Sequence, residues 1–223
     1  MADTRPKALD LFCCAGGATK GLQRAGFHVT GVDINPQPRY CGDAFVQANA
    51  LDSGLDLGAF DFVWASPPCQ KYSITAKLWP GREHPDLVAP TRALLMASAT
   101  PYVIENVPGA PLLHPFTLCG LQFGLRVFRH REFEVSFFVM VPPHQTHRGT
   151  TNSSRTYSTF ASGADMICIA GHNFSREDGA VAMGIDWHMR REEMAQAIPP
   201  AYSEFIGRAA LAHINSKLSQ EAA

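Results

Sequence analysis

The stretch "ALDLFCCAGGATKGLQRAGFHVTGVDI", residues 8–34, decides the fold. Its first five residues, Ala8 to Phe12, form an apolar run that leads into a turn with two glycines. The spacing that follows predicts a helix ending at Gly26, a residue type that commonly closes helices. A second apolar run then ends near Asp33. Strand, turn, helix and strand in this order are typical of a βαβ unit, so the stretch predicts a parallel sheet.

The remaining sequence continues this alternation of strands and helices. The further elements that we expect are strands at 44–51, 60–69 and 100–109, a helix at 84–99, and helices at 186–197 and 201–218. Residues 123–141 have the pattern of two consecutive strands, which we expect to form a hairpin at the far edge of the sheet. The predicted fold class is therefore α/β, with a doubly wound, mostly parallel sheet.

The composition describes a globular chain with no global preference for nucleic acid. Of its 223 residues, 46% are hydrophobic and 17% are charged, which is typical of a folded domain. The net charge of −1 means that any nucleic-acid surface must be local. The sequence lacks the apolar core of a signal peptide and any apolar run long enough to cross a membrane, so we expect a cytoplasmic protein. The six cysteines contain no CxxC pair, and we expect no disulfide framework.

The hydrophobic pattern breaks after residue 141. Residues 142–163 are polar, rich in serine and threonine and poor in core-forming residues, which indicates a small inserted region or a long functional loop that extends to about residue 182. We divide the chain into a larger domain at 1–141, an inserted region at 142–182, and a C-terminal segment at 183–223 that returns to the larger domain.

Polar residues follow the predicted strands at the point where each strand ends. The glycine turn, Asp33, Asn49, Cys69 and Glu105 come after five successive strands. Ligands of open parallel sheets bind at the carboxyl ends of the strands, so we expect these groups to surround one crevice.

Cys69 follows two prolines in the sequence "SPPCQ". A lone cysteine is commonly a small core residue, and this interpretation stays open. A thiol at a rigid strand end could instead be a nucleophile if positive charge, such as that of Arg129 and Arg131, lowers its pKa. Glu105 could be a structural acid, but a buried carboxylate is costly without a task or a partner.

The glycine turn is ambiguous when it is considered alone. It fits a plain strand-to-helix turn as well as a nucleotide-like cofactor site in which Asp33 accepts hydrogen bonds from ribose hydroxyls. The turn does not match GxGxxG, and it lacks a lysine followed by serine or threonine at phosphate-loop spacing. These differences point away from dinucleotides and triphosphates.

Five motifs together resemble the cytosine-5 DNA methyltransferases, which use S-adenosylmethionine. "DLFCCAGGATKGL" resembles the cofactor-binding motif of that family, "SPPCQ" its catalytic Pro-Cys motif and "ENVPG" its Glu-Asn-Val motif. "VFRHREF" resembles QxRxR, and "AIPPAYSEFIG" resembles the final motif, which folds back beside the first. The match covers residues 7–210 in the family's order, and the chain is similar to the compact methylases found in phages. The resemblance implies a Rossmann-like methyltransferase fold in which residues 142–182 form a small target-recognition region.

The resemblance implies catalytic roles for four residues. Cys69 would attack carbon 6 of cytosine, and the base must first be flipped out of the duplex. Glu105 would hydrogen-bond ring nitrogen 3, and Arg131, with Arg129 near it, would bind the carbonyl oxygen of the base. Addition at carbon 6 makes carbon 5 nucleophilic enough to take a methyl group from the cofactor.

The resemblance also implies a site for S-adenosylmethionine. Phe12 would pack on the adenine, Asp33 would hold the ribose, and Asn49 would lie near the adenine amino group. The cofactor-binding residues that we expect are Phe12, Cys13, Cys14, Ala15, Gly16, Gly17, Asp33, Ile34, Asn49, Pro67 and Gln196.

Three positions depart from the family's pattern, and they keep alternatives open. Cys14 replaces the first glycine of the cofactor loop, Gln196 replaces an asparagine, and Val127 replaces a glutamine. A modified cofactor with a carboxylated methyl group is one alternative, because Gln196 or Lys20 could bind its carboxylate. A cytosine-5 methyltransferase acting on tRNA and a catalytically silent DNA-binding homologue are the others.

The partner that we expect is double-stranded DNA, bound by a monomer without any role for a membrane. A restriction-modification system would suit the resemblance, but the sequence names no partner nuclease. The residues that we expect to contact DNA are Gln70, Ser73, Thr75, Arg148 and Arg155.

His144, His147, Cys168 and His172 have a spacing that a zinc site permits, HxxH followed by CxxxH. The spacing is not distinctive, because recognition-region residues that contact phosphate or solvent would show it too. From the sequence we therefore assign no metal site.

Overall fold

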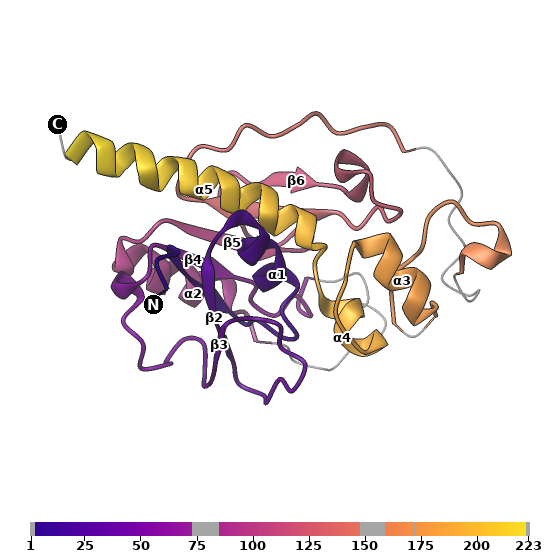
Figure 1. Cartoon of the computed structure of the whole chain (residues 1–223), viewed down its shortest axis with the longest axis horizontal. Helices are drawn as coiled ribbons and strands as arrows, with labels where there is room; N and C mark the ends of the chain where they lie inside the picture. The colour runs from indigo at the N-terminus through magenta and orange to yellow at the C-terminus, as the bar shows by residue number, and fades with distance from the viewer. Residues whose placement is uncertain (1–2, 73–84, 148–158, 172, 222–223) are drawn as a thin grey trace.

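The computed structural model describes residues 3–72, 85–147, 159–171 and 173–221. These residues form one seven-stranded sheet with the order β3-β2-β1-β4-β5-β7-β6 (Figure 1). The strands are β1 (Lys7–Leu11), β2 (His28–Asp33), β3 (Ala44–Gln47), β4 (Phe62–Ala65), β5 (Tyr102–Asn106), β6 (Phe116–Leu118) and β7 (Arg131–Val135). Strands β1 to β5 pair in parallel, which confirms the prediction of a mostly parallel sheet.

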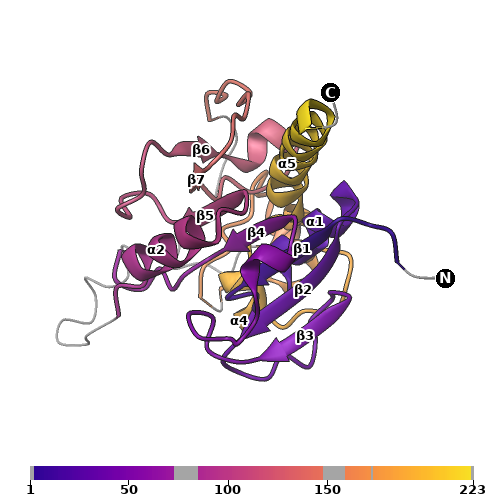
Figure 2. The ribbon, with the colours of Figure 1, turned by 90° about the vertical axis from the view of Figure 1, so that its left-hand side faces the viewer.

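Helices cover both faces of the sheet. They are α1 (Gly17–Ala25), α2 (Val88–Ser98), α3 (Arg176–Met183), α4 (Arg191–Gln196) and α5 (Pro200–Glu221), with short 3-10 turns η1 (Leu57–Ala59), η3 (Gly120–Phe123) and η4 (Phe160–Ser162). Helices α1 and α5 lie together on one face and α2 lies on the other (Figure 2). Within the described ranges, no helix has both the length and the apolar character needed to cross a bilayer.

Two apolar clusters fill the space between the sheet and these helices. Successive residues of a strand point to opposite faces, so Ala8 of β1 faces the cluster under α1 and α5, while Leu9 faces the cluster under α2. Trp64 and Tyr202 are the largest fully buried side chains of the first cluster. Gly21 of α1 lies so close to α5 that a Cβ there would overlap backbone atoms of α5, so α1 and α5 pack tightly.

The prediction that two strands within residues 123–141 pair with each other in a hairpin is wrong. Strand β7 pairs antiparallel with β5 on one side and with β6 on the other, and β6 precedes this stretch. The expected first strand is not formed: η3 ends at Phe123, residues 124–130 form neither helix nor strand, and Arg129 has a φ of 31°. As a result, β7 lies inside the sheet and brings Arg131 beside the end of β5.

Part of the predicted inserted region packs into a third apolar cluster. Ile167, Phe174 and Ala182 are buried there with Met194 of α4 and with Ala15 of the glycine turn. The second half of the predicted region therefore contributes residues to the core. The boundaries drawn at 1–141, 142–182 and 183–223 stay a prediction.

Asp10 is a buried carboxylate between β1 and α1. The Thr19 hydroxyl donates to its Oδ2 at 2.5 Å, and its Oδ1 has no hydrogen-bond partner among the described residues. Burial raises the pKa of Asp10 to about 7, although the Thr19 hydrogen bond acts in the opposite direction. In the folded chain the Asp10 carboxyl group is therefore mainly neutral below about pH 7.

This pKa predicts that the protein loses stability as the pH rises towards 8. A carboxyl with a raised folded-state pKa stabilises the fold below its unfolded pKa of 3.8, and that contribution is lost as the pH rises through about 7. The pKa shift of Asp10 corresponds to a change of at most about 4 kcal/mol in the free energy of unfolding. Urea unfolding at roughly pH 5 and pH 8 should show a smaller pH-dependent loss for Asp10→Asn than for the wild type. The exposed Asp52 provides the control Asp52→Asn, which should follow the wild type. Equal losses in the wild type and in Asp10→Asn would contradict the assignment.

Candidate active site

The Pro-Cys loop is fixed to the carboxyl edge of the sheet by its neighbours. The Asn106 side chain donates to the Pro67 carbonyl at 3.0 Å, and this hydrogen bond is buried. The Ser66 amide donates to the Leu11 carbonyl at 3.1 Å. These bonds tie the residues before Cys69 to the ends of β5 and β1, so the half-buried thiol occupies a defined place.

Glu105 and Arg131 form an ion pair beside this loop. Arg131 Nε lies 3.0 Å from Glu105 Oε1, and the Glu105 residue is only 6% exposed. Burial raises the pKa of Glu105, and the charge of Arg131 and a hydrogen bond from Ser66 oppose that shift. The Glu105 carboxyl group therefore holds its proton to a higher pH than an ordinary glutamic acid.

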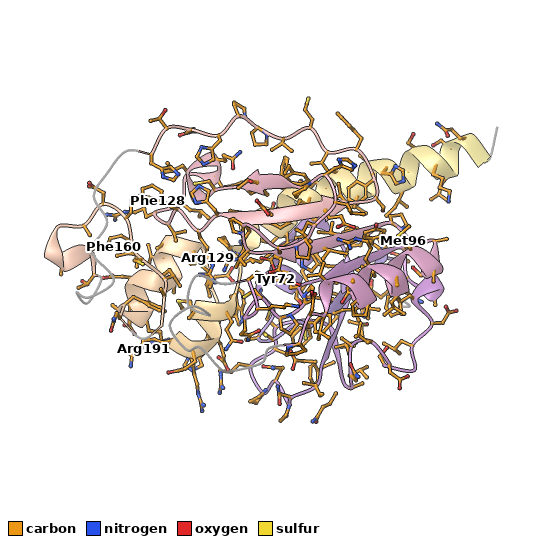
Figure 3. The ribbon with its side chains drawn as sticks, turned by 180° about the vertical axis from the view of Figure 1, so that it is seen from behind. Tyr72, Met96, Phe128, Arg129, Phe160 and Arg191 are labelled. Atoms are coloured by element: carbon orange, nitrogen blue, oxygen red, sulfur yellow. The ribbon has the colours of Figure 1, made fainter. Side chains whose placement is uncertain are left out.

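Arg129 is buried behind this pair and binds backbone carbonyls. Its Nη1 donates to the Ile169 carbonyl at 3.1 Å and its Nη2 to the Ala195 carbonyl at 2.7 Å. Burial and, to a smaller extent, the neighbouring charge of Arg131 lower the pKa of Arg129 to about 9. Figure 3 shows Arg129 between the sheet and the C-terminal segments. The geometry therefore supports a positioning role for Arg129 and leaves the ion pair with Glu105 to Arg131.

The pKa of Cys69 corrects a sequence-based expectation. Burial raises this pKa, and so does the neighbouring charge of Glu105. The charges of Arg131 and Arg129 lower it, as expected, but they do not overcome burial. In the absence of substrate the thiol therefore resists ionisation, and the arginines alone do not activate it.

The glycine turn after β1 has unusual backbone geometry. Phe12, Cys14 and Gly16 all have positive φ, at 63°, 46° and 95°. The Cys14 amide donates to Asp33 Oδ2 at 3.0 Å, and the Asn35 amide donates to Asp33 Oδ1 at 2.9 Å. Each carboxylate oxygen of Asp33 therefore keeps acceptor capacity for a further donor, such as a ribose hydroxyl.

The C-terminal segment lies against the same turn. Cys14 Sγ lies 3.8 Å from Gln196 Oε1, and the Trp187 indole donates to the Ala15 carbonyl at 3.2 Å. A Cβ on Gly17 would lie 2.8 Å from the Ile198 carbonyl oxygen. Two of the three positions that depart from the family's pattern, Cys14 and Gln196, are therefore neighbours.

The rim near β2 and β3 offers groups that suit a nucleoside. Ile34 is 66% exposed, which is unusual for a large apolar side chain at a strand end. Asn49 is exposed, and its side-chain oxygen accepts the Leu51 amide at 3.1 Å. The Asp33 carboxylate can accept hydrogen bonds, Asn49 can donate and accept them, and Ile34 offers an apolar surface. Together these side chains fit the ribose and adenine of the expected cofactor.

The other predicted cofactor residues line the turn or support it. Phe12 is half-buried against the cluster under α2, whereas Cys13, Ala15, Gly16, Gly17 and Pro67 are buried. Lys20 lies 3.9 Å from the Asp186 carboxylate and over the Trp187 ring, so its charge already has a partner.

Of the residues expected to contact DNA, only Gln70 lies within the described ranges, and it is exposed. Ser73, Thr75, Arg148 and Arg155 lie outside those ranges, so their roles stay predictions. Next to Gln70, Lys71 pairs with Asp86 at 3.1 Å, and the Tyr72 hydroxyl also donates to this carboxylate.

Three residues that support the site were not predicted from the sequence. Asn106 and Ser66 hold the Pro-Cys loop and Glu105, and both lie inside the quoted motifs, where their polar side chains were a usable signal. The Tyr202 hydroxyl donates to the Arg129 carbonyl at 3.0 Å and so supports the backbone before Arg131. Nothing in the helical pattern around Tyr202 indicates this contact.

No protein-family model matches the chain, and no curated protein matches it. Among solved structures, the chain resembles the Dnmt2 methyltransferase of Schizosaccharomyces pombe, with a TM-score of 0.62 and 13% identity over 95% of this chain and 100% of that chain. It also resembles the methyltransferase EhMeth of Entamoeba histolytica, with a TM-score of 0.59 and 12% identity over 95% of this chain and 99% of that chain.

A partial likeness involves a DNA modification methyltransferase encoded within an E. coli prophage. It has a TM-score of 0.43 and 22% identity, and it spans 57% of this chain and 45% of that chain. The two longer matches show the fold, and the prediction of a Rossmann-like methyltransferase fold is confirmed. They agree with the resemblance to cytosine-5 DNA methyltransferases seen in the motifs.

Proposed function

We propose that this chain transfers a methyl group from S-adenosylmethionine to carbon 5 of cytosine in DNA. The observation that carries the proposal is the grouping of a thiol, a buried carboxyl group and a guanidinium at one edge of the sheet. Cys69 follows β4, Glu105 ends β5, and Arg131 begins β7 and pairs with Glu105 at 3.0 Å. This order and chemistry match the roles that the motifs imply.

S-adenosylmethionine supplies an electrophilic methyl group when it is bound. Asp33 would accept hydrogen bonds from the ribose, Ile34 and Phe12 would contact the adenine, and Asn49 would lie at its amino group. The Cys14 and Gln196 side chains would close the opposite side of the turn.

The side chains of the site then divide the work on the base. The Cys69 sulfur adds to carbon 6, and Glu105 gives its proton to ring nitrogen 3 as negative charge builds there. Arg131 stabilises charge on the carbonyl oxygen of the base. Carbon 5 takes the methyl group and then loses its proton to a base. The electron pair left at carbon 5 reforms the ring double bond and expels the Cys69 thiolate.

The pKa directions suit this order of events. Charged Glu105 raises the pKa of Cys69, whereas Arg131 lowers it. A neutral Glu105 that donates to the base no longer opposes thiolate formation, and the charges of Arg131 and Arg129 then act only against burial. The site therefore opposes the thiolate less when a base is in place than when it is not.

An assay of labelled methyl transfer tests the proposal against its alternatives. We expect the purified chain to label duplex DNA well above tRNA, and nucleoside mass spectrometry should find 5-methylcytosine. Label in tRNA alone would support the tRNA alternative. Absence of label in both, with cofactor binding intact, would support the silent homologue. A heavier adduct at carbon 5 that forms only with a carboxylated cofactor would show that this cofactor, and not S-adenosylmethionine, is the donor.

A further inference from the structure

Four possible metal ligands meet at the edge of the sheet that β6 forms, away from the glycine turn. They are Cys119, His130, His144 and His147, and their ligand atoms all lie within 4.8 Å of one another. Strands β6 and β7 pair Leu118 with Arg131, so the next residues outward, Cys119 and His130, also lie opposite each other. His144 and His147 come from the chain that runs past β6 after β7 (Figure 1).

The distances between ligand atoms suit a tetrahedral ion. Zinc–nitrogen and zinc–sulfur bonds place two nitrogens about 3.3 Å apart and a nitrogen and a sulfur about 3.6 Å apart. Cys119 Sγ lies 3.6 Å from His147 Nε2, and His130 Nε2 lies 3.0 Å from His144 Nε2. Both distances come close to the required ones without rearrangement of the backbone.

The surroundings of the ligands support a bound cation. The backbone amides of Leu121 and Gly120 donate hydrogen bonds to the Cys119 sulfur. These amides would stabilise a thiolate bound to a metal ion. The His147 ring stacks on Phe128, with centroids 4.2 Å apart, so its orientation is also fixed (Phe128 is labelled in Figure 3).

We propose that Cys119, His130, His144 and His147 bind one zinc ion. One thiolate and three imidazoles form a ligand set of the kind that tetrahedral zinc takes, and four protein ligands leave no open position. The site is therefore structural. It fixes the segment 144–147, at the start of the predicted recognition region, to the β6–β7 edge.

This set shares only two histidines with the one that the sequence permitted. Cys168 is not part of the cluster, and His172 lies outside the described residues. The sequence could not indicate Cys119 and His130, because strand pairing brings them together and no short spacing relates them to His144.

Metal analysis of untagged protein tests the proposal. After incubation with Zn²⁺ and gel filtration, we expect about one zinc per chain by mass spectrometry. Co²⁺ should give the visible bands of a tetrahedral site and a sulfur-to-cobalt charge-transfer band. Chelation with 1,10-phenanthroline should lower the Tm of the wild type by about 5 °C or more.

Variants separate this site from incidental binding. Cys119→Ser should remove the charge-transfer band, and His144→Ala with His147→Ala should lose the zinc. The matched controls Cys168→Ser and His213→Gln should keep both the zinc and the band. If Cys119→Ser fails to fold, the double histidine variant and the chelation experiment still show whether zinc is bound at this site.

The proposal is overturned if the wild type retains no zinc and gives no cobalt band, since a hydrogen-bonded stack of imidazoles would then explain the cluster. Retention of the band in Cys119→Ser or loss of zinc in Cys168→Ser would overturn it as well.

Discussion

Duplex DNA that carries 5-fluorocytosine at the target is expected to become covalently attached to the wild-type chain, and Cys69→Ser is expected to prevent this. The same variant should lower methyl transfer to ordinary DNA by about 10³-fold or more, because a hydroxyl is a far weaker nucleophile than a thiolate. After addition and methyl transfer, carbon 5 must lose a proton before the thiolate can leave. Fluorine cannot leave as a cation, so the adduct should persist on a denaturing gel.

The trapping experiment depends on the proposed function and tests it directly. Duplex with plain cytosine is the substrate control, and circular dichroism with thermal unfolding should show that Cys69→Ser keeps its fold. Full activity in the serine variant would exclude Cys69 as the nucleophile. Methylation of ordinary DNA without any trapping by 5-fluorocytosine would exclude the covalent path.

The parallel half of the fold could be predicted because its signals are local. The run from Ala8 to Asp33 contains two strands, a helix and the glycine at φ 115° that ends the helix. Parallel strands also place their carboxyl ends on one edge, so Cys69 and Glu105 could be assigned to one crevice in advance.

The antiparallel edge could not be predicted because its pairing is not local. Strand β6 has only three residues, too few for a recognisable alternation, and β7 is inserted between β5 and β6. The aromatic and β-branched residues around Arg129 favour a strand, but tertiary contacts hold Arg129 itself at φ 31°. The partners of β7 follow from the three-dimensional packing.

The electrostatics of the site also escape sequence-based prediction. Two arginines near a cysteine suggested a lowered thiol pKa, but burial and Glu105 raise it. Likewise, the pattern RxR does not reveal that Arg131 pairs with Glu105 whereas Arg129 binds the carbonyls of Ile169 and Ala195. Desolvation depends on what covers a group, and that information comes only with the fold.

Glu105→Gln is expected to lower methyl transfer by about 10²- to 10⁴-fold, the usual range for loss of a general acid. An amide can hydrogen-bond ring nitrogen 3, but it cannot supply a proton as charge builds there. Burial raises the pKa of Glu105, so the proton remains available to a higher pH than on an ordinary glutamic acid. The wild-type rate should rise with pH as the Cys69 thiolate forms and fall as Glu105 ionises, and the variant should lack the falling limb. Single-turnover rates across pH measure this.

The same substitution should change the reactivity of Cys69 in the opposite direction. Charged Glu105 raises the pKa of Cys69, so a neutral glutamine should lower that pKa and shift alkylation by iodoacetamide to lower pH. Peptide mass spectrometry distinguishes Cys69 from the other five cysteines. Glu132→Gln on β7 is the matched control, because Glu132 lies opposite Asn106 and should change neither quantity. A structural role for Glu105 would lower activity without making the thiol more reactive. Slower methyl transfer together with faster alkylation of Cys69 is therefore the expected result, and unchanged alkylation would contradict an effect of ionised Glu105 on the thiol.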